Sequence, residues 1–271
     1  MSRTSLAGVT LLAVVLLAVV ALLGVGTPIE SFDDGERTGD DELDPEILFE
    51  QGFVHGDELE SVSGQRVTEA TDGTRTVRTV HRVVERPYVE YRSEVIDAED
   101  PTAVGDTFVS NATTTWWYDA DEHEVEYLAV EEPFDDEAVE AARAEEAARQ
   151  RELVEVTYRG TETVADRETH VIDVTATNET VAGVSLLVGD LELVREVEST
   201  ESRDDLAIVE WTVRIDAEYG YPLAETVVVD GSDGEYVLSE RFETVSFNDD
   251  LREEPFVFEP PPDAEVRSLS E

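Results

Sequence analysis

Apolar and polar residues alternate over most of the chain from about residue 65 onward. The stretch YVEYRSEVI, residues 88–96, places Val89, Tyr91 and Val95 on one side, with glutamate and arginine on the other. IVEWTVRID, residues 208–216, repeats the pattern. Because successive side chains of a strand point to opposite faces, this alternation predicts half-buried β-strands. Similar runs occur at 76–84, 106–110, 114–118, 124–130, 153–158, 169–175, 223–229, 235–247 and 256–258.

Short groups of turn residues separate the predicted strands. They are DADEH after Tyr118, YRGTE near residue 160, YGYP at 219–222 and DGSDG at 230–234. Strands that follow one another through short turns pair in antiparallel fashion. The pattern therefore predicts one antiparallel meander rather than a parallel sheet.

Residues 133–154 break the alternation and predict a helix. This segment is rich in alanine, with acidic residues in its first turn and arginines toward its end, an order that suits the helix dipole. Residues 44–62 predict either a weak amphipathic helix or a pair of short turns, interrupted at Gly52 and Gly56. Residues 178–198 predict either a hairpin or a short helix. The apolar stripe of the alanine-rich helix is narrow, which predicts that the helix lies over a surface rather than in a deep core. The stripe consists of Phe134, Ala138, Ala141, Ala142 and Ala148.

An uncharged apolar run, Leu6 to Val25, lies near the start of the chain. As a helix at about 1.5 Å per residue it would cross the roughly 30 Å hydrocarbon layer of a bilayer. Arg3 precedes it and an acidic stretch follows, an asymmetry that keeps the amino terminus in the cytoplasm. A cleaved signal peptide is the alternative, because small residues at 24–27 offer a cleavage site.

We therefore expect three parts: a transmembrane anchor or signal peptide at 1–26, an acidic linker at 27–45 and a folded domain at 46–271. The expected location is the cell membrane, with a single span and the C-terminal domain extracellular, or the medium if the N-terminal segment is cleaved. Two glycosylation patterns, at Asn111 and Asn178, would then lie in an exported domain.

The composition narrows the possible functions. The 271 residues include 66 acidic and 19 basic side chains, a net charge of −47, and every basic residue is an arginine. This charge predicts a halophilic protein that folds in concentrated salt, where screening lengths near 1 M fall to roughly 3 Å. It also disfavours binding to nucleic acid. The absence of cysteine excludes disulfides, thiolate metal sites and a lipid-modified N-terminal cysteine.

Candidate catalytic and metal-binding groups are few. The sequence contains no nucleophile elbow, phosphate-binding loop or zinc-protease motif, and its four histidines are scattered. DADEHEVE, residues 119–126, lacks the spacing and the glycine of a calcium loop. We therefore expect no catalytic residue, no metal and no cofactor, and the protein is not predicted to be an enzyme.

Five stretches, in order, resemble the landmarks of the LolA-like family, the outer-membrane lipoprotein-sorting proteins and their relatives. The resemblance covers roughly residues 45–267, and the closing F-x-F-x-P-P is its most specific part. The stretches are ERPYVEYR at 85–92, VSNATTTWWYDAD at 109–121, YRGTETVADRETHVIDV at 158–174, YGYPLAETVVVDG at 219–231 and FVFEPPPDAEV at 256–266.

The resemblance implies an α+β fold: an incomplete, strongly curved antiparallel β-barrel whose apolar concave face is covered by helices and accepts acyl chains. Trp116 takes the position of the family's usual tryptophan, but the sequence leaves open whether Trp116 or its neighbour Trp117 points inward. Ala112 departs from the family by replacing a turn glycine, so we expect either a different turn geometry or a positive φ at Asn111.

From the apolar sides of the predicted strands, the expected groove lining is Val89, Tyr91, Trp116, Val209, Trp211, Val213 and Phe256. These residues can equally form the plain hydrophobic core of a β-protein. By the family's pattern, Arg86 before Pro87 helps to hold the lid, although a surface ion pair with Glu85 is the alternative.

Two functions remain. The first is non-catalytic, extracytoplasmic binding of lipid or lipoprotein acyl chains, by a carrier or chaperone that acts locally because a tethered copy cannot shuttle between membranes. The second is a membrane-anchored envelope sensor or interaction domain with no transported ligand. The expected partners are a lipid or an acylated protein and, through the N-terminal helix, the membrane itself.

Overall fold

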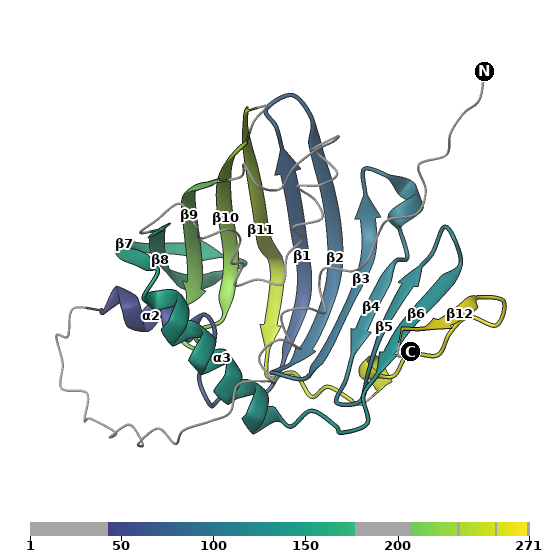
Figure 1. Ribbon diagram of the computed structural model, residues 1–271. Helices are drawn as coiled ribbons and strands as arrows, with labels where there is room; N and C mark the ends of the chain where they lie inside the picture. The colour runs from purple at the N-terminus through teal and green to yellow at the C-terminus, as the bar shows by residue number, and fades with distance from the viewer. Residues whose placement is uncertain (1–42, 177–206, 232–233, 253, 270–271) are drawn as a thin grey trace. The chain divides into compact units, whose positions relative to one another are not determined.

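The computed structural model describes residues 43–176, 207–231, 234–252 and 254–269 (Figure 1). They belong to one compact unit, Glu42–Glu271. The predicted anchor, most of the predicted linker, the segment 178–198 and Asn178 lie outside the described residues. No helix among the described residues combines the length and hydrophobicity needed to cross a bilayer.

The described residues form one open sheet of 12 strands, in the order β12-β6-β5-β4-β3-β2-β1-β11-β10-β9-β8-β7. All neighbours are antiparallel except β12 and β6, which are parallel. The strands are β1 (Val62–Thr71), β2 (Thr76–Arg86), β3 (Glu90–Ala98), β4 (Thr107–Ser110), β5 (Thr114–Asp119), β6 (Glu124–Ala129), β7 (Val154–Val164), β8 (Arg167–Ala176), β9 (Ala207–Asp216), β10 (Pro222–Gly231), β11 (Gly234–Phe247) and β12 (Glu265–Ser268). The predicted antiparallel sheet is therefore confirmed.

Among the described residues two helices accompany the sheet, α2 (Pro45–Gln51) and α3 (Asp136–Arg151), with short 3-10 turns η2 (Pro101–Ala103) and η4 (Glu254–Phe256). α2 begins where the Asp44 carboxylate accepts the N–H of Glu46. The Asp135 carboxylate caps α3 by accepting the N–H of Ala138. These caps satisfy helix N–H groups that have no partner within the helix.

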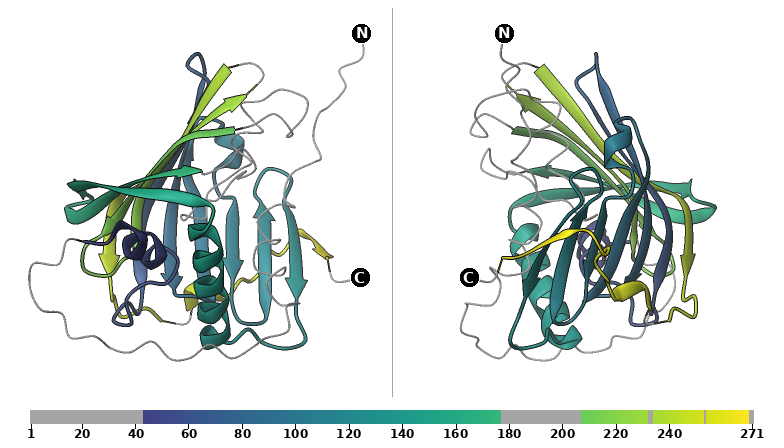
Figure 2. Two further views of the ribbon diagram at one scale, coloured as in Figure 1. Left: turned by 60° about the vertical axis from the view of Figure 1, so that its left-hand side comes forward. Right: turned by 90° about the vertical axis from the view of Figure 1, so that its right-hand side faces the viewer.

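The sheet is curved, and both helices lie on its concave side (Figures 1 and 2). We call this side the concave face and the opposite side the outer face. Two hydrophobic clusters form the core of the concave face. One joins α2 to β7, β8 and β9, and the other joins Leu59 to strands β1, β2, β10 and β11.

Three sequence predictions were wrong. YRGTE is not a turn, because β7 continues through it with a bulge near Gly160, and the chain reverses instead at Ala165 and Asp166, both at positive φ. Residues 256–258 are not a strand; the last strand is β12. In the predicted apolar stripe of α3, Ala138, Ala141 and Ala148 are exposed, because the helix turns a more polar side toward the domain.

Candidate functional site

The concave face beneath α2 is closely packed and apolar. Phe49 of α2 is fully buried, and its ring meets the Trp211 ring of β9 edge-on at 5.8 Å. Val213 and Ile172 complete the contact from β9 and β8 and are also fully buried. Burying each such side chain contributes about 1.5–3 kcal/mol, so α2 is held firmly on this part of the sheet.

An aromatic row crosses the concave face on the other side of the sheet's centre. Tyr91 of β3 contacts Phe108 of β4 at 5.8 Å between ring centroids, and Phe108 contacts Trp117 of β5 at 5.7 Å. The register places Phe108 opposite Trp117, so the two rings share one face. Trp117 is 6% exposed. It is therefore Trp117, and not Trp116, that points to the concave face.

A polar region lies between the apolar sector and the aromatic row. The hydroxyl of Tyr221 donates to the carboxylate of Glu85 at 2.8 Å, and both side chains are buried. Burial raises the pKa of Glu85, and the nearby Arg143 and Arg66 partly oppose that rise. A carboxylate in this setting is an unusual component for a surface that holds only hydrocarbon.

α3 meets this region with polar side chains. The Arg143 guanidinium lies 5.0 Å from the centre of the Tyr88 ring, in a cation–π contact. Only two residues of α3 are buried, Ala147 and Gln150. Arg151, near its C-terminal end, binds the α2 carboxylate of Glu50 at 2.7 Å. α3 is thus attached mainly through polar side chains, by Arg143 to the Tyr88 ring and by Arg151 to α2.

His55 lies in the same place, between the rings of Tyr88 (5.5 Å) and Tyr221 (4.8 Å). Burial, followed by the charge of Arg143, lowers the pKa of His55 to about 3. Its imidazole is therefore neutral and serves as part of an aromatic stack under α3.

The described residues 249–252 and 254–268 cross the outer face, and we call them the C-terminal strap. Phe256 is buried there with the Arg86 guanidinium 5.3 Å above its ring. Arg86 also donates to Glu90 at 2.7 Å and to the carbonyl of Leu251. Trp116 meets Phe258 of the strap at 6.4 Å. The two adjacent tryptophans therefore lie on opposite faces of β5, Trp116 against the strap and Trp117 beside Phe108 on the concave face.

Asn111 joins the strap to the β4–β5 turn. Its Oδ1 accepts the N–H groups of Thr113 and Thr114, and its Nδ2 donates to the carbonyl of Phe256 at 3.0 Å. Asn111 does not adopt a positive φ, so that expectation was wrong. Glycosylation at Asn111 stays a prediction, and its acceptor nitrogen is the atom that contacts the strap.

The predicted lining residues are thus divided between places. Tyr91, Trp211 and Val213 lie on the concave face, whereas Trp116 lies on the outer face against the strap and Phe256 belongs to the strap itself. Val209 is 53% exposed, because the β9–β10 register shifts opposite it. Val89 lies in the β2–β3 turn and is half-buried.

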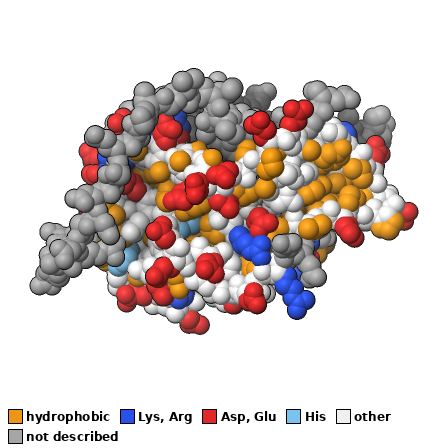
Figure 3. All heavy atoms as spheres, turned by 90° about the horizontal axis from the view of Figure 1, so that it is seen from below, with side chains coloured by type: hydrophobic (Ala, Val, Ile, Leu, Met, Phe, Trp, Pro, Cys, Tyr) orange, Lys and Arg blue, Asp and Glu red, His pale blue; other side chains and the backbone are white. Residues whose placement is uncertain are grey.

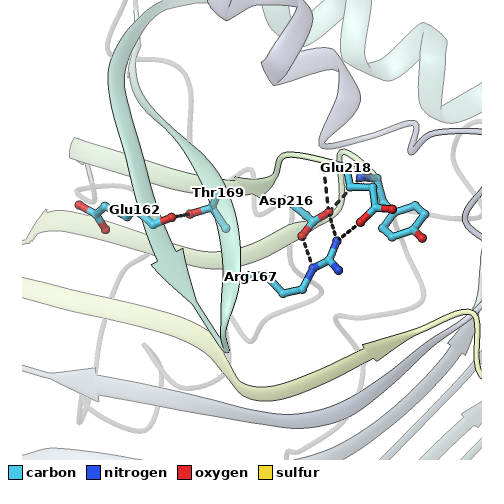
Figure 4. A network of polar contacts seen from close by, with 6 residues as sticks. Glu162, Arg167, Thr169, Asp216 and Glu218 are labelled. Carbon is cyan, nitrogen blue, oxygen red and sulfur yellow. Dashed lines mark hydrogen bonds and ion pairs between the residues drawn. The ribbon is translucent and has the colours of Figure 1, made fainter.

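A separate open hollow of about 320 Å³ lies at the β9–β10 turn, lined by Asp166, Arg167, Glu168, Ala217 and Glu218. Arg167 donates to both oxygens of Asp216, at 2.8 and 2.9 Å, and to Glu218 at 2.8 Å (Figure 4). Asp216 also accepts the backbone N–H of Tyr219 at 2.9 Å. These bonds secure the turn that Gly220 makes at φ +70°, so we assign the hollow a structural role.

Seen from below, acidic side chains are spread over the surface, and hydrophobic side chains gather toward the side on which β4, β5 and β6 lie (Figure 3). Within the described ranges, no three histidine or acidic side chains are grouped so that they could hold a metal ion.

No family model matches the sequence, and no curated protein matches it. Solved structures similar to this one include a LolA superfamily protein from Nitrosomonas europaea, with 8% identity, a TM-score of 0.34, and coverage of 80% of this chain and 99% of that chain. Mycobacterium tuberculosis lipoprotein LppX has 14% identity and a TM-score of 0.34, over 76% of this chain and 95% of that one.

The Pseudomonas aeruginosa MucA/MucB complex is also similar, with 13% identity and a TM-score of 0.42, over 79% of this chain but 59% of that chain. At TM-scores below 0.5 these similarities leave the function open.

Sequence reasoning missed three parts of the concave face. Phe49 lies in a helix that was expected, yet its contact with Trp211 joins segments far apart in the chain. The sequence left open whether Trp116 or Trp117 points inward, and only the register with Phe108 shows that it is Trp117. Arg143 was one arginine among several in a charged helix, and only its position over Tyr88 distinguishes it.

Proposed function

We propose that the folded domain binds a lipid or the acyl chains of a lipoprotein on its concave face, without catalysing a reaction. α3 is the cover that gives way when the ligand enters. The weak attachment of α3 carries this proposal, because Ala147 and Gln150 are its only buried residues. Its contact with the β2–β3 turn is the cation–π pair of Arg143 and Tyr88.

The energies favour displacement of α3 rather than α2. A cation–π contact contributes about 0.5–2 kcal/mol, and each methylene moved from water into an apolar site about 0.8 kcal/mol. A few methylenes laid along the aromatic row of Tyr91, Phe108 and Trp117 therefore compensate for the loss of the Arg143 contact. The fully buried Phe49 holds α2 much more firmly.

We assign the contact that holds the cover to Arg143 rather than to Arg86. Arg143 belongs to α3 itself, whereas Arg86 lies on the outer face against the strap. In the same proposal, residues 1–26 hold the domain at the outer surface of the cell membrane, so the ligand is received and passed on locally.

The test uses the absence of cysteine in this chain. Cysteines introduced as Tyr88→Cys and Arg143→Cys are then the only thiols, and a bifunctional maleimide can link α3 to the sheet. A pyrene-labelled fatty acid is the probe, because energy transfer from the protein's three tryptophans reports its binding. We expect the doubly substituted protein to take up the probe before linking and to lose most of that uptake afterwards.

The two single-cysteine variants, treated with the same reagent, are the controls and should keep their uptake. Equal uptake by the linked and unlinked double variant would overturn the role of α3. Lipid extraction from protein purified in molar salt gives an independent measurement, and we expect a co-purifying lipid.

A sensor or interaction domain with no transported ligand is the second candidate. The dense packing beneath α2 favours it, since Phe49, Ile172 and Val213 leave no exposed surface there. This alternative predicts that no lipid is extracted and that the pyrene probe is not taken up by any variant.

A further inference from the structure

The imidazole of His55 lies where α3 meets the sheet. His55 belongs to the segment between α2 and β1 and is 6% exposed. Its ring stacks on the Tyr88 ring at 5.5 Å between centroids and meets the Tyr221 ring at 4.8 Å. The Arg143 guanidinium of α3 lies 5.0 Å from the centre of the same Tyr88 ring. One tyrosine thus contacts both the buried histidine and the arginine that holds the cover.

The groups around the imidazole come from every element of this junction. The carbonyl oxygen of Gln51, in α2, lies 3.4 Å from Nδ1 of His55. The hydroxyl of Tyr221, just before β10, donates to the buried carboxylate of Glu85 on β2 at 2.8 Å. The titratable and charged groups of the junction are Asp57, Glu85, Tyr88, Glu140, Arg143 and Tyr221. Among them, Arg143 is the positive charge that α3 brings.

The neutral state of this imidazole depends on α3. Burial and, second, the charge of Arg143 lower the pKa of His55 to about 3. That charge belongs to α3 and leaves the junction when the helix separates from the sheet. Separation also lets water reach the rings, which weakens the effect of burial. Both changes raise the pKa of His55 toward its ordinary value of 6.5.

Separation of α3 and proton binding by His55 are therefore linked. The ring binds a proton more tightly when α3 has separated, so acid shifts the equilibrium toward the separated state. The shift begins near pH 6.5 and grows as pH falls toward about 3. Separation acts on Glu85 in two opposing ways, because loss of Arg143 raises its pKa and hydration lowers it. The direction of the response is therefore set by His55.

We propose that His55 makes the cover sensitive to acid: protonation of its imidazole repels Arg143, and α3 separates from the concave face. The inference rests on the proposed function, because α3 is the cover that a ligand must displace. It adds a condition to that function. Ligand exchange is slow near neutral pH, where α3 is held in place, and becomes fast in mild acid.

The position of α3 can be measured without a ligand. Because the chain has no cysteine, Gln65→Cys on β1 and Glu145→Cys on α3, both at exposed positions, place one spin label on the sheet and one on the cover. Electron–electron double resonance then gives the population in which α3 has separated. In molar salt, we expect this population to rise at least about fivefold between about pH 7 and about pH 5.

His55→Phe in the same labelled background keeps a ring between the two tyrosines but cannot bind a proton, and His55→Gln is a second variant without a titrating ring. In both, the separated population should change less than about twofold over this range. His81→Gln is the matched control, because burial also lowers the pKa of His81 to about 3, while its ring contacts Ser93 of β3 rather than the rings under α3. It should keep the full response, and circular dichroism at each pH checks that every variant is folded.

Uptake of a pyrene-labelled alkyl alcohol, whose charge does not change with pH, tests the proposed function separately and should become several-fold faster in acid. A separated population that is constant with pH overturns the inference, and so does one that rises equally in His55→Phe and His55→Gln. In either case the proposed function stands if the probe is taken up. If the probe is not taken up at any pH, the proposed function fails, and with it the effect of acid on ligand exchange.

Discussion

Two histidines couple the folding of this domain to pH. His55 lies between tyrosine rings under α3, and His81 of β2 lies opposite Arg66 of β1. Burial lowers the pKa of each ring to about 3, with Arg143 and Arg66 as the second causes. The folded state therefore binds a proton on either ring much more weakly than the unfolded chain does.

A histidine pKa that is depressed on folding makes stability fall as pH decreases from about 6.5 toward about 3. Each such ring contributes a slope of about 1.4 kcal/mol per pH unit in this window. We expect His81→Gln to have a shallower loss of unfolding free energy with acid than the wild type, measured by urea denaturation at constant salt. Identical slopes would contradict this assignment.

The buried Glu85 acts in the opposite direction. Its pKa is raised by burial, so the folded state holds the proton more tightly, and stability falls as pH rises above the unfolded value of about 4.5. The comparison of His81→Gln with the wild type cancels this contribution, because both proteins keep Glu85.

Asn248 connects the end of β11 to the segment before β1. It adopts φ +58°, its Oδ1 accepts the N–H of Glu60 at 2.8 Å, and its Nδ2 donates to the carbonyl of Glu58 at 2.9 Å. Asn248→Gly keeps the backbone conformation but loses these bonds, so we expect a loss of about 1–3 kcal/mol.

Asn248→Ala should lose about 1–2 kcal/mol more, because an alanine at positive φ is strained. Chemical denaturation in molar salt measures both variants. Equal stabilities for the glycine and alanine variants would show that the positive φ is not a reason for asparagine here.

Among the elements, α3 and the C-terminal strap are attached in different ways. The strap buries Phe256 and receives Arg86, and it ends as β12 beside β6. α3 buries two residues and makes a cation–π contact through Arg143. The strap therefore belongs to the stable part of the sheet, whereas α3 is a layer that can separate from it.

Arg143→Ala tests this difference. Without the contact to Tyr88, α3 should open more often, so amide hydrogen exchange within 136–151 should become several-fold faster while the strap is unaffected. Arg149→Ala is the control on the same helix, since the Arg149 side chain is 67% exposed and binds Glu146 of α3 itself. Equal exchange rates in the two variants would remove Arg143 as the residue that holds the cover.

Considered as a whole, the protein is dominated by its charge of −47. Many of its arginines lie in ion pairs on exposed positions, as Arg78 does with Glu69, Asp97 and Glu243. These pairs offset a small part of the repulsion, since exposed ion pairs contribute about 0–1 kcal/mol each. Dissolved salt must screen the rest.

We expect the melting temperature to rise steeply with sodium chloride between about 0.15 M and 3 M, because the screening length shortens from about 8 Å to below 3 Å. Circular dichroism melts give the measurement. Sodium sulfate at matched ionic strength separates screening from the strengthening of apolar contacts, which sulfate increases further. A melting temperature that stays constant or falls with salt would contradict the role of charge repulsion.

The local pattern of the chain was enough to predict most of the strands. Alternation at 76–84 became β2 and alternation at 235–247 became β11, because a strand that is buried on one face must place apolar side chains at every second position. The alanine-rich segment became α3 for an equally local reason, its helix propensity and end charges. The side that α3 turns toward the sheet was not predictable, because Arg143 depends on a ring in another segment.

The sequence by itself determined the predominance of β-strands, the antiparallel pairing of most neighbouring strands and the charge of −47, since each follows from spacing or from a sum of charges. Only the tertiary structure decided that Trp117 faces inward while Trp116 meets the strap, and that Arg143 of α3 lies over the Tyr88 ring. The alternation of apolar and polar residues shows only that neighbouring side chains of a strand point to opposite faces of the sheet. Which face is concave, and what covers each face, depends on contacts between residues far apart in the chain.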